Sequence, residues 1–310
     1  MLKKMWYKKH FRVVMLCCLL TAGITRQGMA QSLSNAQALL EPSGTQYFQN
    51  EYLSNPAMAG IDSGLHLNAA YHRQMGGVDG APVTKYFTAD GNIGKRVGLG
   101  LNVFNDVAGL INRSRVAVSY AYHLPLTDRG QELHFGLSLA LNVQRIDYQK
   151  LNGDPNDPSV SSFNRRDDYF EGEYGMAYTD KHLTVQAALP NIRGLVKGDN
   201  LGADGGVIFI TAAAYRFTPE GALSSLTPKV TYRGVRGYKN ILDAGVNAGF
   251  LDNLLSVMAM YHTTKSLTTG IGVDIRKTVV FQVMYTTQTG GVKTYTDGSL
   301  EIGATVNLFR

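Results

Sequence analysis

The chain has 310 residues, of which 17% are charged, 34 are glycine and 17 are tyrosine. Six of its 30 Lys and Arg residues, and none of its 24 Asp and Glu residues, lie in residues 1–30, so the rest of the chain carries 24 charges of each sign. The pI of about 9.1 therefore comes from the first thirty residues and gives no reason to expect nucleic-acid binding, while abundant Gly and Tyr argue against a helical fold.

Residues 1–30 show the order of features found in an export signal. A basic stretch up to Arg12 is followed by an apolar run over residues 13–24 and by small residues around residue 29. The run is too short for a spanning helix. We therefore predict a signal peptide over residues 1–30. It contains both cysteines, Cys17 and Cys18, and the residues before Cys17 match a lipoprotein signal poorly.

Residues 31–60 precede the first predicted strand. Residues 32–40 have the pattern of one short helix, whereas residues 41–60 are polar and rich in turn-forming residues. We predict an N-terminal extension over residues 31–60, which either stays periplasmic or folds into the lumen of a barrel formed by residues 61–310.

Residues 133–143 give the clearest strand signal. Leucine, phenylalanine and valine occupy every odd position, and small or polar residues occupy every even position. Side chains alternate between the two faces of a strand, so one face is apolar along its whole length. Eleven residues tilted as in a barrel rise about 28 Å, close to the apolar height of outer-membrane barrels. This pattern favours a membrane barrel, although composition alone also allows a soluble sandwich.

The same pattern predicts further strands along the chain. The predicted strands, fourteen in all, are residues 64–73, 84–92, 97–105, 112–122, 132–144, 172–178, 182–188, 206–217, 227–235, 240–249, 254–262, 267–274, 278–286 and 299–309.

The lengths of the connections support a membrane barrel. Outer-membrane barrels have short periplasmic turns and longer external loops. In an even-stranded barrel with both termini in the periplasm, every odd-numbered connection faces outside. The three longest gaps, residues 146–171, 190–205 and 288–298, are connections five, seven and thirteen. The tightest turns fall at even-numbered connections. We therefore predict a 14-stranded antiparallel transmembrane β-barrel of the outer membrane.

Two pairs of side chains have residue types that occur in catalytic or metal sites. His134 and Ser138 share the polar face of one strand, where an acidic neighbour would complete a hydrolytic site, or both are simply polar residues facing the lumen. The sequence around Ser138 runs through a strand and does not match a nucleophile elbow. His66 and His72 are about 20 Å apart on an extended strand and cannot share a metal, so we expect solvated histidines. We predict no enzyme activity, no catalytic residue, no metal site and no cofactor.

The predicted external loops contain the residues most suited to recognition. The acidic residues of the longest loop, beside Arg165 and Arg166, match no calcium-loop spacing, so a loop that contacts a partner is favoured over a calcium site. The predicted partner-binding residues are Gln74, Asp79, Pro82, Asp154, Asp157, Arg165 and Arg166.

Several short motifs, in order along the chain, carry a family resemblance. They are Gln46-Tyr47-Phe48, Asn55-Pro56-Ala57, Ala59-Gly60, Tyr71-His72-Arg73-Gln74, Gly77-Val78-Asp79-Gly80-Ala81-Pro82, Val97-Gly98-Leu99-Gly100, Asn105-Asp106, Ser119-Tyr120-Ala121-Tyr122-His123-Leu124-Pro125-Leu126, Phe135-Gly136-Leu137, Asp154-Pro155, Asp157-Pro158 and Gly298-Ser299-Leu300-Glu301-Ile302-Gly303. Together they resemble the PorP/SprF family of type IX secretion membrane proteins. The chain departs from that family at Met75, where a Trp is usual. It departs from the usual ending of outer-membrane proteins at Phe309, which falls out of phase with the apolar face of the last strand.

The resemblance implies an outer-membrane component of the bacterial type IX secretion and gliding machinery. It implies binding or anchoring of secreted surface proteins such as adhesins, and contacts with periplasmic parts of the machine. The expected partners are therefore these proteins and outer-membrane lipid, with no nucleic acid. The alternative function is an outer-membrane diffusion channel for small solutes.

Overall fold

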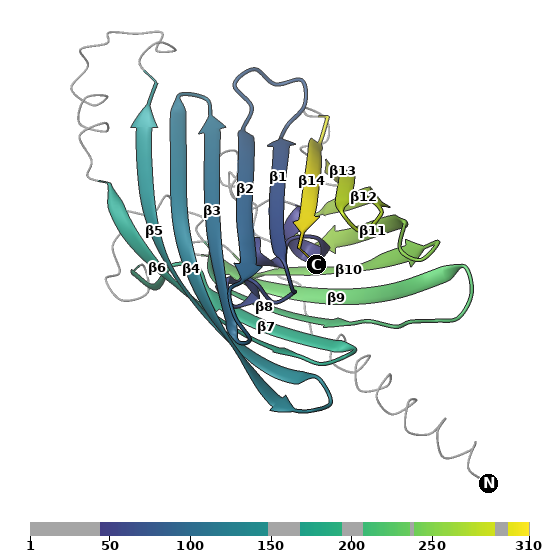
Figure 1. Ribbon diagram of the computed structural model, residues 1–310. Helices are drawn as coiled ribbons and strands as arrows, with labels where there is room; N and C mark the ends of the chain where they lie inside the picture. Colours follow the sequence, from purple (N-terminus) through teal and green to yellow (C-terminus); the bar gives the residue numbers. More distant parts are fainter. Residues whose placement is uncertain (1–43, 148–167, 194–206, 236–238, 289–296, 310) are drawn as a thin grey trace, which may run out of the picture. The chain divides into compact units, whose positions relative to one another are not determined.

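A computed structural model describes residues 44–147, 168–193, 207–235, 239–288 and 297–309, all within one compact unit, Ala36–Arg310 (Figure 1). This part of the chain begins with the short helices α3 (Thr45–Phe48), η1 (Glu51–Leu53) and η2 (Pro56–Met58). The strands that follow are β1 (Leu65–Arg73), β2 (Val83–Asn92), β3 (Val97–Ala108), β4 (Ile111–Thr127), β5 (Gln131–Ile146), β6 (Tyr169–Thr179), β7 (Leu183–Leu189), β8 (Val207–Tyr215), β9 (Leu223–Val235), β10 (Ile241–Phe250), β11 (Leu255–His262), β12 (Ser266–Ile275), β13 (Val279–Gln288) and β14 (Ser299–Leu308). Among the described residues, no helix is long and apolar enough to cross a membrane.

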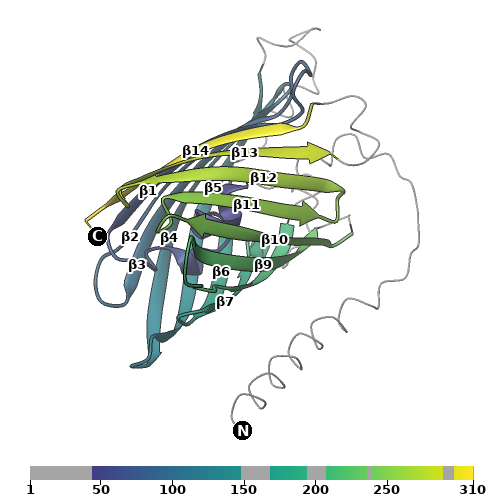
Figure 2. The ribbon, with the colours of Figure 1, turned by 90° about the vertical axis from the view of Figure 1, so that its right-hand side faces the viewer.

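The strands form one closed antiparallel barrel. Each strand pairs with its neighbours in the sequence, and β1 pairs with β14 in a ladder that places Tyr71 opposite Ile302 (Figures 1 and 2). Closure satisfies the backbone groups that an open sheet would leave unpaired at its edges. The predicted 14-stranded antiparallel barrel is therefore confirmed, and an open sheet or a two-sheet sandwich is excluded.

The two faces of the wall have the polarity expected of a barrel in lipid. Along β5, Leu137 and Leu139 are 58% and 59% exposed on the outer face, whereas His134 and Ala140 are fully buried on the inner face. Most of the buried side chains with polar or charged groups lie on strands, and most of the exposed large side chains are apolar or aromatic. A soluble protein buries its apolar side chains, so this inversion indicates hydrocarbon outside and a polar lumen inside.

Strand boundaries differ from the predictions most clearly at the hairpin of β4 and β5. Both strands extend beyond the predicted ranges, residues 112–122 and 132–144. Pro125 has no N–H to donate, which favours ending β4 before it. In the structure Pro125 still lies opposite Glu132, and the register shifts between Pro125 and Thr127, so an irregularity in the ladder accommodates the proline.

The last strand has the register expected from the sequence. Leu300 and Ile302 are exposed on the outer face, and Glu301 between them is buried. Phe309 lies beyond the end of β14 in a left-handed conformation with φ of +57°. Phe309 therefore does not follow the alternation of β14 because it lies beyond the end of the strand.

Two of the even-numbered connections are tight turns, as predicted. Leu251, Asp252 and Asn253 between β10 and β11 all have positive φ, and so do Arg276 and Lys277 in the three-residue connection between β12 and β13. Successive left-handed residues give the primed turns whose twist matches a hairpin.

The turn between β12 and β13 uses two residues that do not favour this backbone. Arg276 has φ of +56°, a conformation that costs a non-glycine residue about 1–2 kcal/mol. Arg276→Gly should therefore raise the free energy of unfolding by about 0.5–1 kcal/mol after the greater flexibility of unfolded glycine is subtracted. Urea unfolding in lipid vesicles measures this, and Arg276→Ala, which keeps the strain, should show no gain. Equal stabilisation by both substitutions would contradict the strain explanation.

Candidate functional site

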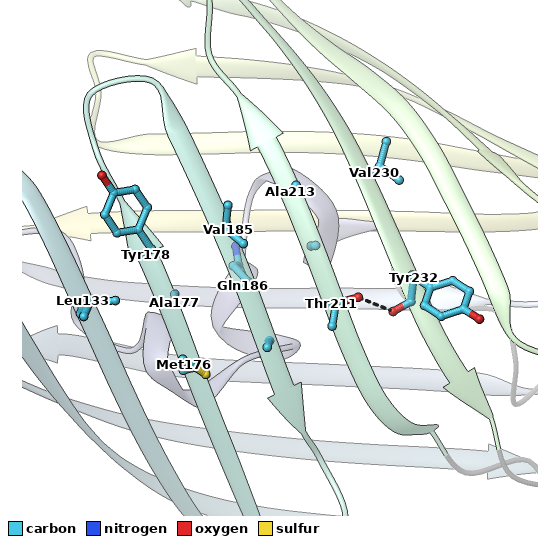
Figure 3. Close-up of a pocket in the computed structure, with 12 residues that line it drawn as sticks. Leu133, Met176, Ala177, Tyr178, Val185, Gln186, Thr211, Ala213, Val230 and Tyr232 are labelled. Atoms are coloured by element: carbon cyan, nitrogen blue, oxygen red, sulfur yellow. Dashed lines mark hydrogen bonds between the residues drawn. The ribbon is translucent and has the colours of Figure 1, made fainter. Parts of the chain in front are cut away.

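Residues 44–61, named here the lumenal segment, lie inside the barrel. They contain α3, η1 and η2, and their side chains or backbone contact inward-facing groups on strands around the wall, from β2 to β14. Figure 3 shows helical turns of this segment behind the wall, with Gln186 directed toward them. Of the two locations expected for the extension, residues 44–60 take the lumenal one. Residues 31–43, with the helix predicted at 32–40, lie outside the described residues.

One side of the wall is shaped to receive the backbone of this segment. Strand register places five small inward residues opposite one another on β3 to β7. This small-residue row consists of Gly98, Ala121, Gly136, Gly175 and Ala188. A Cβ atom added at Gly136 would overlap the backbone of Pro56 and Ala57, and one at Gly98 would overlap the carbonyl of Ala59. The row is therefore the seat on which η2 rests.

The motif Asn55-Pro56-Ala57 fits this seat for identifiable reasons. The Asn55 side-chain oxygen accepts a hydrogen bond from the Ala57 N–H at 3.0 Å, which caps η2, and Pro56 occupies its first position. The Asn55 amide also donates to the Met176 carbonyl of β6 at 3.2 Å. Ala57 and Ala59 are fully buried, because only small side chains allow the two backbones to approach so closely.

The opposite side of the wall holds α3 by charged groups. Glu301 of β14 accepts hydrogen bonds from the Gly44 N–H at 2.8 Å and the Thr45 N–H at 3.0 Å. It also accepts one from the Thr45 hydroxyl. The free N–H groups at the start of a helix favour an anion, so the carboxylate fixes the beginning of the segment.

A buried network on β9, β10 and β11 holds the next part. The Tyr47 hydroxyl donates to Asp243 at 3.0 Å, and Asp243 also accepts from Arg233 at 2.7 Å and contacts His262 Nδ1 at 2.7 Å. Burial raises the pKa of Tyr47 well above its usual value, so its hydroxyl remains a donor. Asp243 is fully buried and Arg233 is 2% exposed, so this ion pair is shielded from solvent.

A third contact holds η1. Lys229 of β9 donates to the Tyr47 carbonyl at 2.5 Å and to the Glu51 carboxylate at 2.7 Å. Gln186 of β7 donates to the same carboxylate. These bonds connect Glu51 to two strands at once and neutralise its charge by an ion pair with the buried lysine.

His134 and Ser138 belong to the seat of the segment. His134 bonds through Nδ1 to His123 Nδ1 at 2.8 Å and through Nε2 to the Thr179 hydroxyl at 2.8 Å. Ser138 bonds to Ser119, whose hydroxyl also contacts the Tyr52 hydroxyl of the segment at 2.7 Å. The Ser138 hydroxyl also bonds to the carboxylate of Glu173, which lies opposite it on β6. Both ring nitrogens of His134 are bonded to His123 and Thr179, so the three groups do not form a hydrolytic site. The geometry therefore matches the reading of two polar groups that face the lumen.

The other histidines differ from expectation in their exposure. His66 and His72 do face the same side of β1, but they are 8% and 2% exposed, so the expectation of solvated histidines was wrong. Both lie between inward-facing residues of β14 and β2: His66 is opposite Asn307 and Asp90, and His72 is opposite Glu301 and Thr84. In the described part of the chain, no three His, Cys, Asp or Glu side chains lie close enough to hold a metal ion.

The predicted partner-binding residues lie in different surroundings. Asp79 is exposed at the tip of the loop between β1 and β2, and Pro82 is half-buried at its end. Gln74 is 4% exposed and its backbone N–H donates to the Pro82 carbonyl at 2.9 Å, so its side chain does not meet a partner in this conformation. Asp154, Asp157, Arg165 and Arg166, with the suggested calcium site, lie outside the described residues.

The charged residues that hold the segment are not among those predicted from the sequence. Lys229, Arg233, Asp243 and Glu301 all occupy positions that alternate with outward apolar residues in their strands. A charged residue at an inward position of a membrane strand predicts a contact inside the lumen, because the charge must be paired or solvated there.

A groove of about 420 Å³ lies on the outer, lipid-facing surface (Figure 3). Small residues on β7 and β8, among them Ala187 and Ala213, form its floor, and larger side chains such as Val185, Val230 and Tyr232 stand at its sides. It is almost wholly apolar and lies on the opposite face of the wall from the lumenal network.

Comparisons with known proteins agree with this architecture. The barrel is similar to the toluene transporter TbuX of Ralstonia pickettii, at 13% identity and a TM-score of 0.50, over 84% of this chain and 94% of that one. It is also similar to the P. putida toluene transporter TodX, at 11% identity and a TM-score of 0.50, over 85% and 95% of the two chains. A search of curated proteins finds no matching sequence.

At these identities the structural likeness shows only the fold. The sequence itself matches the profile of the type IX secretion system membrane protein family PorP/SprF over residues 36–306. The match includes the lumenal segment, its seat and all fourteen strands as far as residue 306. The chain therefore belongs to the PorP/SprF family of type IX secretion system membrane proteins and is a β-barrel of the bacterial outer membrane.

Proposed function

We propose that this barrel acts by binding, as an anchor of the secretion and gliding machinery. Its external loops hold secreted surface proteins such as adhesins, and its periplasmic turns contact periplasmic components of the machine. The lipid-facing strands keep both contacts at a fixed place in the outer membrane.

The observation that carries this proposal is the occupied lumen. The lumenal segment is bonded to Glu301 and Asp243 on one side and rests on Gly136 and Gly175 on the other. A barrel bonded internally in this way is suited to serve as a scaffold, because its own chain crosses the lumen. The alternative function is a diffusion channel, because the similar barrels TbuX and TodX are toluene transporters. A bonded segment across the lumen favours the anchor.

The long connections lie together at one end of the barrel, which supports placing the secreted partner at that end. In a closed antiparallel barrel, the connections that follow β1, β5, β7 and β13 share one end. There, the Gly109 N–H donates to the Gly80 carbonyl at 2.9 Å, and the Gly76 N–H donates to the Gly298 carbonyl at 2.8 Å. These bonds join three neighbouring connections into one surface. We place the secreted partner on Asp79, Pro82, Asp154, Asp157, Arg165 and Arg166.

Site-specific cross-linking tests both contacts. The only cysteines, Cys17 and Cys18, lie in the predicted signal peptide, so an introduced cysteine is the only thiol of the exported chain. In cells, Asp79→Cys should cross-link a secreted surface protein. Lys181→Cys, in the turn at the opposite end, should cross-link a periplasmic component of the machine. The side chains of Asp79 and Lys181 are both exposed, so neither substitution disturbs the barrel.

The two positions serve as controls for each other. Capture of the same protein at both ends, or of no secretion component at either, would contradict the anchor. Capture of a surface protein only from Lys181→Cys would reverse the proposed orientation.

A further inference from the structure

A second cavity, of about 290 Å³, lies in the lumen beside the lumenal segment. The segment forms one side of it, and residues of β1, β2 and β12 to β14 form the other. It lies near the end of the barrel where β1 begins and where β2 and β14 end, because the strand residues that line it include His66, Asp90 and Asn307.

The charged groups around this cavity are acidic. Asp62, Asp90 and Asp274 line it, and its lining contains no lysine or arginine among the described residues. Glu51 also lines it but is paired with Lys229. No salt bridge within the described part of the chain involves the three aspartates. The cavity therefore lacks a matching cation of its own.

A buried histidine adds an unused acceptor. His66 is 8% exposed, and its Nδ1 lies 2.6 Å from the side-chain oxygen of Asn307. Because that oxygen can only accept, Nδ1 donates to it, and in the neutral ring Nε2 is an acceptor. Nε2 has no hydrogen-bond partner among the described residues, and the same holds for Oδ1 of Asp274. Buried acceptors without a donor are unfavourable, so both atoms point to a ligand that supplies N–H groups.

We propose that this cavity binds an alkylguanidinium or alkylammonium ion, either as a free solute or as the side chain of an arginine or lysine on a partner. Its several N–H donors reach acceptors that are spread around the wall. The acidic groups do not converge on one point as metal ligands do, since no three of them in the described chain are close enough. Met58, Ile61 and Val280 give the alkyl stem an apolar surface.

Methyl NMR of the full exported chain in detergent micelles tests this site. With methionine methyl groups labelled, n-butylguanidinium should produce a saturable shift of the Met58 resonance, and the neutral n-butylurea should not. Asp62→Asn with Asp274→Asn should weaken binding by about tenfold or more, because two charge-assisted hydrogen bonds are lost. Asp128→Asn, a matched change at an exposed residue of the turn between β4 and β5, should leave the affinity unchanged.

Two results would overturn the site: an equal shift with n-butylurea, or unchanged affinity in the double variant. Asp62 is exposed and precedes β1, so Asp62→Asn alone provides a variant with an undisturbed barrel. Repeating the titration with a blocked peptide that contains one arginine separates the sources. Tighter binding of the peptide than of n-butylguanidinium assigns the site to a partner side chain, and tighter binding of the free ion assigns it to a solute. The test is independent of secretion, so it can fail while the anchor function stands.

Discussion

Replacing Gly136 with alanine should displace the lumenal segment from its seat and lower the free energy of unfolding by about 1–3 kcal/mol. The added Cβ would overlap backbone atoms of Pro56 and Ala57, which cannot rotate away as a side chain can. The neighbouring strand offers no alternative space, because Asn55 and Pro56 also occupy the position above Gly175, which lies opposite Gly136 on β6. Either η2 lifts from the wall or the ladder deforms.

Three measurements follow this change. Urea unfolding in lipid vesicles gives the stability, protease cleavage within residues 44–61 reports displacement of the segment, and planar-bilayer recording reports an opened lumen. Gly136→Ala should increase both cleavage and conductance over the wild-type chain. Gly172→Ala on β6 is the matched control, because its Cβ would meet only Ile192 at ordinary contact distances. Equal behaviour of the two variants would show that the seat does not retain the segment. High conductance of the wild-type barrel would favour a channel over an anchor.

Replacing Asp243 with alanine should have the largest effect of a single substitution, a loss of about 3–5 kcal/mol. Asp243 receives hydrogen bonds from Tyr47, Arg233 and His262, all in a region shielded from solvent. Removing the carboxylate takes from the buried guanidinium of Arg233 its ion pair with Asp243. It also releases α3 from β10.

Two further variants separate the ion pair from the contact with the segment. Tyr47→Phe removes the hydroxyl that bonds to Asp243 and Arg233 but leaves the ion pair between those two residues, and it should cost about 1 kcal/mol. Asp168→Ala breaks the Arg145–Asp168 pair, in which the side chains are 41% and 39% exposed, and should cost no more than about 1 kcal/mol. Unfolding titrations of the three variants under one condition give the comparison. A loss at Asp243 no greater than that at Asp168 would contradict a shielded network.

The motif residues of the lumenal segment have a role that the sequence does not reveal. Asn55, Pro56 and Ala57 contribute to the family resemblance, but the sequence assigns no contact to them. In the structure they cap η2, start it and allow it to touch Gly136. Their function could not be derived from the sequence because each depends on a surface contributed by distant strands.

The sequence by itself determined the architecture of the wall. Alternation of side chains is a local property of an extended backbone, so residues 133–143 and the other strands reveal their number, their two faces and the end of the barrel at which each connection lies. The contents of the lumen were decided only by the tertiary structure. Tyr47 meets Asp243 across 196 residues and Thr45 meets Glu301 across 256, and the small-residue row is aligned by the registers of five successive strands. Such contacts depend on how the closed sheet curves back on itself, which no local pattern specifies.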